Sequence, residues 1–123
     1  MRKFGSLLYD SPPLVVNPEI ACIFGLEAAL VLQYLHSQIY NKQKEKKKDS
    51  FINGYYWVQI SITELGKQFI FISEKAIKRI FKKLKDEGII FVEQLHKSKQ
   101  NHTNFYTINY AILENQRGTL YNV

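Results

Sequence analysis

A dense cluster of basic side chains between residues 73 and 87 is the part of this sequence best suited to contact a charged partner. Six Lys or Arg residues stand against three acidic ones, a local balance of +3. A step of 100° per residue places the apolar side chains on one helical face, made of Ile77, Ile80, Phe81 and Leu84 and bordered by Ala76. The opposite side collects Lys75, Lys78, Arg79 and Lys82, with Lys83 and Lys85 on the flanks. The segment therefore predicts an amphipathic helix with one buried and one basic face.

A basic helix face of this kind suits recognition of double-stranded DNA. If the helix enters the major groove, its N-terminal half faces base edges, and the candidates to read them are Ser73, Lys75, Lys78 and Arg79. Arg79 is the best guanine reader, because its planar fork matches two acceptors of that base. Lys82 and Lys83 are predicted to neutralise phosphates. The alternative is a solvated helix face whose lysines only keep the protein in solution.

The flanking segments predict how this helix is positioned. Ser61-Ile62-Thr63-Glu64 fits a capping box and begins a short helix that ends near Gln68 or Phe69. Ser73 then caps the basic helix, which runs to about Glu87 and stops at Gly88. Strands follow at about 89–96 and 103–109. This order of helix, turn, basic helix and hairpin is typical of a winged helix-turn-helix.

The hairpin tip, residues 97–102, would form the wing. Lys97, Lys99 and Asn101 are its candidates for contact with phosphates or the minor groove. An ordinary polar hairpin tip explains the same residues almost equally well.

The N-terminal half predicts further helices. Asn17, Pro18 and Glu19 read as the cap and first turn of a short helix that Gly25 ends. A second, centrally buried helix is expected from about Leu26 to Asn41. The lysine-rich run 42–48 is predicted to be a solvated loop, although it would also attract DNA weakly. An Asn-Gly turn then leads into a strand over about 55–60.

The predicted fold class is therefore α+β and mostly helical, a winged helix-turn-helix with extra N-terminal helices and a C-terminal β-hairpin wing. Residues 1–16 are expected to be an extended arm that packs on its own domain or on a second copy, giving a homodimer through the arm and helices. The winged domain would span 17–115, with a short amphipathic segment over 110–115, and 116–123 would be a tail.

Composition and motifs argue against several other functions. The net charge of +6 favours polyanionic partners. Cys22 is the only cysteine, so an internal disulfide and a cysteine-built zinc site are excluded, and its apolar neighbours predict a small buried side chain. His36 is expected to be a hydrogen-bonded structural residue.

Nothing in the sequence has the spacing of a nucleophile, an acid pair, a metal site or a Gly-rich phosphate loop. We therefore expect no enzyme activity, cofactor or metal. No signal peptide or membrane-spanning run is visible either, which predicts a cytoplasmic protein without membrane contact.

The order of several short motifs resembles the winged-helix domain of phage and plasmid replication initiators and of DnaD-type primosomal proteins. The motifs span most of residues 14–110: Leu14 to Pro18, Gly25 to Gln33, Trp57, Phe71 to Arg79, Leu84 to Ile90 and Thr103 to Tyr110. The resemblance implies an origin-binding domain, often dimeric, that works with other replication proteins.

Two departures from that family pattern leave alternatives open. Such initiators usually carry a further C-terminal domain that recruits a helicase or its loader, and Gln100, Asn101 and His102 occupy wing positions that are often acidic or Arg. The chain is then either an excised domain or a stand-alone protein that kept the DNA-binding half. The same fold also serves transcription regulators, and a phage-encoded inhibitor acting through protein contacts is a third interpretation.

Overall fold

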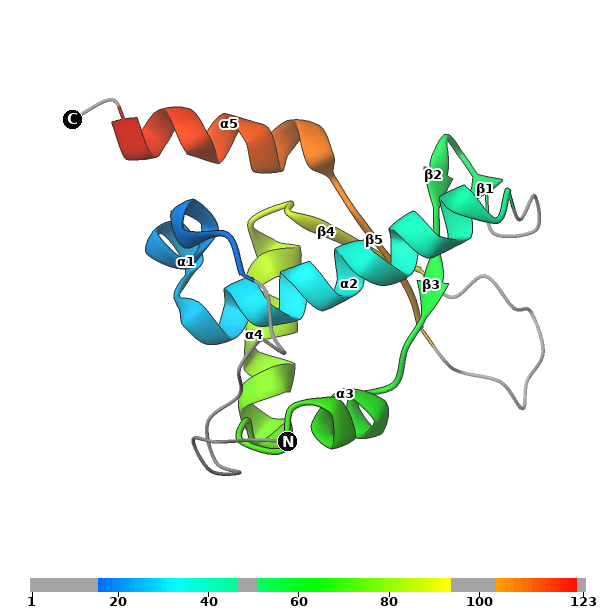
Figure 1. Ribbon diagram of the computed structural model, residues 1–123, viewed down its shortest axis with the longest axis horizontal. Helices are drawn as coiled ribbons and strands as arrows, with labels where there is room; N and C mark the ends of the chain where they lie inside the picture. Colours follow the sequence, from blue (N-terminus) through cyan, green and yellow to red (C-terminus); the bar gives the residue numbers. More distant parts are fainter. Residues whose placement is uncertain (1–15, 47–50, 94–103, 122–123) are drawn as a thin grey trace, which may run out of the picture.

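The computed structural model describes residues 16–46, 51–93 and 104–121, with only the backbone for 117–121. This part of the chain is α+β, with five helices and two small antiparallel sheets (Figure 1). The helices are α1 (Pro18–Phe24), α2 (Leu26–Lys44), α3 (Ile62–Gln68), α4 (Glu74–Asp86) and α5 (Tyr110–Tyr121). The strands are β1 (Phe51–Ile52), β2 (Tyr55–Tyr56), β3 (Val58–Gln59), β4 (Ile90–Glu93) and β5 (Phe105–Ile108).

Helix α2 is the central element, as the apolar periodicity predicted. Figure 1 shows it crossing the molecule, with α5 on one side and α3 on the other. Seven of its side chains are buried: Ala28, Ala29, Leu30, Val31, Leu32, Leu35 and Ile39. All of them except the two alanines join one core with side chains from α3, α4 and the β3–β5–β4 sheet.

The lysine-rich run begins inside α2, so the expected helix end at Asn41 and the expected loop from Lys42 are wrong. Helix α2 continues to Lys44. Lysines in a last helical turn interact favourably with the negative end of the helix dipole, which allows this extension. Residues 47 and 48 of the run lie outside the described residues.

The strand expected over 55–60 is broken in two at Trp57. Tyr55 and Tyr56 pair back onto Ile52 and Phe51 across the Asn53-Gly54 turn, whose two central residues have φ of 55° and 83°. The indole Nε1 of Trp57 donates a hydrogen bond to the Ile52 carbonyl at 2.9 Å. This bond holds the chain at the break, after which Val58 and Gln59 pair with β5 instead.

The first and last helices of the described chain bear on three further expectations. Helix α5 runs to Tyr121 without interruption, so the expected boundary between residues 115 and 116 falls inside a helix. Cys22 is exposed rather than buried, because Ile20 and Phe24 turn the apolar side of α1 towards the core and Cys22 lies opposite. Of the expected arm, residues 1–15 lie outside the described residues, and Val16 packs against the core.

Candidate nucleic-acid interface

The ends of α4 are where the sequence predicted them. Ser73 has extended backbone, and its Oγ accepts a hydrogen bond from the Ala76 N–H at 3.1 Å. At the other end, Gly88 adopts φ of +76°, a left-handed conformation that favours glycine. A capping hydrogen bond therefore sets the start of the basic helix, and a left-handed glycine sets its stop.

The apolar side of α4 anchors it to the core and to the sheet. Ile77, Phe81 and Leu84 are buried, while Ile80 is half-buried. The Phe81 ring lies 4.8 Å from the ring of Tyr106 in β5, with the two planes tilted by 31°. Because β5 is the middle strand of the β3–β5–β4 sheet, this contact fixes the helix relative to both strands of the predicted wing.

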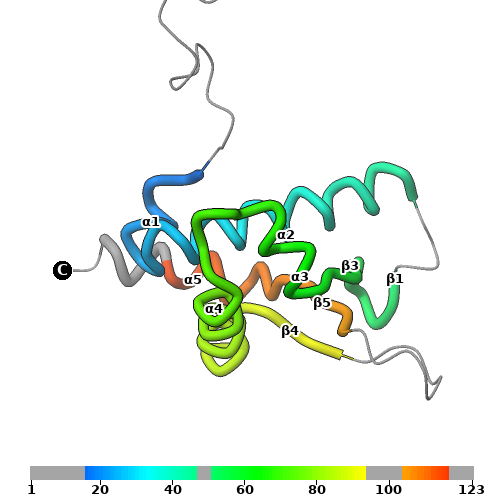
Figure 2. Tube along the Cα trace, turned by 90° about the horizontal axis from the view of Figure 1, so that it is seen from below, coloured from blue at the N-terminus to red at the C-terminus, as the bar shows by residue number. Residues whose placement is uncertain are grey.

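The opposite side of α4 presents its basic residues to solvent. Every predicted contact residue of this helix is exposed: Ser73, Lys75, Lys78, Arg79, Lys82 and Lys83. Lys85 is exposed as well. Figure 2 looks nearly along α4 and shows that the helix lies at one face of the molecule. The structure thus brings six of the nine predicted site residues together on one helix.

Two of the basic side chains of α4 also border a hollow. Arg79 and Lys83 line a hollow of about 510 Å³ whose other wall is the α1–α2 junction, residues 24–28. That wall includes Glu27 and Leu26, which is 59% exposed. On the helical wheel, Lys75 precedes Arg79 by one turn and lies about 40° from it, and Lys82 and Lys78 follow further round the same exposed face. Arg79 and Glu27 line the same hollow, which the sequence pattern alone did not reveal.

Helix α3 and the turn after it support the exposed end of α4. Ser61 Oγ accepts from the Glu64 N–H at 3.0 Å, which confirms the predicted cap. Leu65 and Phe69 are buried, and the Tyr34 ring of α2 meets the Phe69 ring edge-on at 5.7 Å. Between Phe69 and Ser73, Ile70 and Phe71 are exposed. The sequence pattern alone did not assign these two side chains to a contact site.

The structure fixes the root of the predicted hairpin but not its tip. Strands β4 and β5 pair antiparallel from Ile90 with Ile108 to Glu93 with Phe105. Of the expected ranges 89–96 and 103–109, the described residues Ile89, Asn104 and Asn109 are not in a strand, and 94–96 and 103 lie outside the described residues. Lys97, Lys99 and Asn101 lie outside the described residues.

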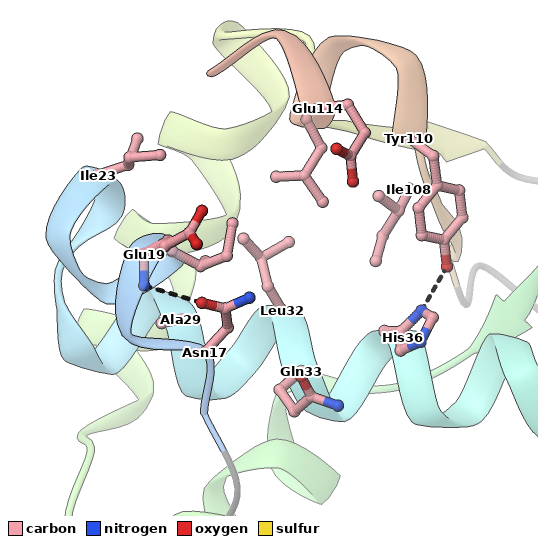
Figure 3. Close-up of a pocket in the computed structure, with 12 residues that line it drawn as sticks. Asn17, Glu19, Ile23, Ala29, Leu32, Gln33, His36, Ile108, Tyr110 and Glu114 are labelled. Atoms are coloured by element: carbon pink, nitrogen blue, oxygen red, sulfur yellow. Dashed lines mark hydrogen bonds between the residues drawn. The ribbon is translucent and has the colours of Figure 1, made fainter. Parts of the chain in front are cut away.

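A second hollow, of about 270 Å³, lies between α1, α2 and α5 (Figure 3). Apolar side chains such as Leu32 and Ile108 form part of its lining, and Glu19 and Glu114 contribute carboxylates. On its lining, His36 Nδ1 and the Tyr110 hydroxyl are hydrogen-bonded at 2.9 Å. His36 therefore joins α2 to α5, in agreement with a structural role. Burial raises the pKa of Tyr110 to about 12.

Within residues 16–46, 51–93 and 104–121, no three His, Cys, Asp or Glu side chains come together as a metal site requires. None of the helices described is long and apolar enough to cross a membrane. Comparison with known proteins found no matching family, curated protein or solved structure. The geometry of α4 and its neighbours is therefore the basis for assigning a function.

Proposed function

We propose that residues 58–108 form a winged helix-turn-helix that binds double-stranded DNA, with α4 as the recognition helix. The single observation that carries this proposal is the exposed basic face of α4, opposite its buried anchor. Helices α3 and α4 pack against each other, and the antiparallel pair β4–β5 follows directly. This succession is the one in which a second helix enters the major groove and a hairpin contacts the backbone beside it.

The direction of α4 agrees with this role. Ser73, Lys75 and Lys78 lie in its N-terminal half, which is the half that meets base edges in helix-turn-helix proteins. The positive end of the helix dipole also lies there and favours phosphate oxygens. Lys82 and Lys83 lie one turn further on, where neutralising phosphates is the more fitting role.

The place of Arg79 refines the proposal. Arg79 and Glu27 line one hollow beside the α1–α2 junction, and Lys75 and Lys78 do not line it. Arg79 nevertheless follows Lys75 by one helical turn on the same exposed face. We therefore assign base-edge contacts to Lys75, Lys78 and Arg79 together.

The biological context we propose is the origin-binding domain of a phage or mobile-element replication initiator, acting with other replication proteins. This part rests on the resemblance of residues 14–110 to such domains. A footprint on DNA from the protein's own locus tests it: protection of one short region supports an origin site, whereas uniform protection contradicts it.

A salt titration with labelled duplex DNA tests DNA binding itself. The variant K82A/K83A removes the two charges of α4 that are assigned to phosphates, and the matched control K42A/K44A removes two from the far end of α2, remote from α4 in Figures 1 and 2. Each lost phosphate contact lowers the slope of log affinity against log salt by about 0.9. We expect a drop of about 1.8 for two such contacts in K82A/K83A and little change in the control. Absence of binding at low salt, or equal effects of both variants, would refute the proposal.

A further inference from the structure

The turn between α3 and α4 exposes two large apolar side chains. Ile70 is 87% exposed and Phe71 is 59% exposed. Their neighbours Phe69 and Ile72 are 1% and 3% exposed, so the chain is anchored in the core immediately before and after the pair. The Ile72 N–H donates to the Phe69 carbonyl at 3.0 Å and closes a four-residue turn. The two central residues of that turn consequently project outwards.

Phe71 also has an aromatic contact at its base. The Phe71 ring meets the buried Phe69 ring at 6.0 Å with planes 79° apart, an edge-to-face contact. Ile70 is β-branched, which restricts its χ1 rotamers. Together they form a small exposed apolar ridge.

The surroundings of this ridge indicate its partner. It immediately precedes Ser73, the cap of α4, so it lies beside the end of α4 that we assign to base edges. Lys67, in the last turn of α3, precedes the ridge in the chain, and Lys75, in the first turn of α4, follows it. Both lysine side chains are exposed. An apolar ridge between lysines is complementary to a polyanion that also presents methyl groups. In the major groove, thymine is the base that does so, through its C5-methyl group.

We propose that Ile70 and Phe71 contact thymine methyl groups in the major groove and give this protein a preference for T-rich DNA. The inference rests on the proposed function, because it needs α4 at the groove. It assigns sequence preference to apolar side chains in the turn, in addition to the basic residues of the helix.

Uracil-for-thymine replacement tests the contact directly, since it removes the methyl group and leaves phosphates and base pairing unchanged. Two labelled duplexes of one T-rich sequence, one with thymine and one with uracil, are titrated with the protein. We expect about fourfold weaker binding to the uracil duplex for each methyl group buried. The ratio of the two affinities should stay constant as salt increases, because an apolar contact releases no counterions.

The variant I70S/F71S should bind both duplexes equally, at the level of the parent protein on the uracil duplex. Both side chains are exposed, so this variant retains the core. The control F51S removes another exposed aromatic side chain, in β1, and should keep the thymine preference. If F51S keeps the thymine preference, the effect of I70S/F71S comes from the ridge and not from a general loss of surface hydrophobicity.

The remaining outcomes are distinguishable. Equal affinity of the parent protein for both duplexes overturns the thymine contact and leaves DNA binding intact. A thymine preference that survives in I70S/F71S also overturns it. If no duplex binds at low salt, the proposed function fails as well. A change of oligomeric state in I70S/F71S, measured by analytical ultracentrifugation, would show instead that the ridge packs against a second copy.

Discussion

Ser73 offers a prediction that separates the stability of α4 from its contact with DNA. Its Oγ accepts from the Ala76 N–H at 3.1 Å and caps the helix, and the residue is exposed at the end assigned to the groove. Ser73→Ala removes the cap without adding charge. Ser73→Asp keeps a capping oxygen but places a negative charge where a phosphate would approach.

Ser73→Asp should be the more stable of the two variants but the weaker in DNA binding. Loss of an N-cap hydroxyl costs about 1 kcal/mol of unfolding free energy, so Ser73→Ala is destabilising by about that amount. Aspartate caps about as well as serine and gains roughly 0.3–1 kcal/mol from the helix dipole, so Ser73→Asp should be as stable as the parent or slightly more so. For DNA the order reverses. A like charge at about 5 Å from a phosphate costs roughly 0.8 kcal/mol in water, which is about a fourfold loss of affinity, and more where solvent is excluded.

Urea denaturation and duplex titration at low salt measure the two effects. Trp57 is the single tryptophan and is 5% exposed, so its fluorescence reports unfolding. Asn17→Asp is the matched control, because Asn17 also caps a helix, accepting from the Glu19 N–H at 2.8 Å, and gains the same charge on α1. If Ser73→Asp is the less stable variant, the capping argument is wrong. If it binds DNA as well as Ser73→Ala does, the end of α4 does not face phosphates.

Two further predictions concern backbone conformation and titration. Gly88→Ala should lower the unfolding free energy by about 1–2 kcal/mol, because alanine must adopt φ of +76° there although nothing lies within 4 Å of its Cβ. Gly66→Ala, inside α3, should instead raise the unfolding free energy by up to about 1 kcal/mol, because the new Cβ would meet only the Glu74 side chain, at 3.4 Å. Urea denaturation measures both variants, and a change of the same sign in both would contradict this reasoning. Because burial raises the pKa of Tyr110 from 10.0 to about 12, the unfolded chain releases this proton at lower pH than the folded protein does. Stability from this group is complete below pH 10 and is lost as the pH rises towards 12, so Tyr110→Phe should show a smaller decline over that interval, and an equal decline in both proteins would refute the effect.

Local interactions made much of the fold predictable from the sequence. The starts of α1, α3 and α4 follow from Asn17, Ser61 and Ser73, because a cap bonds to an amide two or three residues away. The faces of α2 and α4 follow from the 100° spacing of their apolar residues. The basic face of α4 was predictable for the same reason.

Other features were decided only by tertiary structure, because they depend on which distant segments meet. The break at Trp57 arises from a hydrogen bond to Ile52 together with pairing of β3 to β5. The hollow that Arg79 and Glu27 line depends on how the α1–α2 junction packs against α4. Apolar sequence alone could not show that Phe69 and Ile72 enter the core while Ile70 and Phe71 stay outside. The sequence determined that α4 would have a basic face, and the packing around it decided which of its side chains line a hollow and that an apolar ridge precedes the helix.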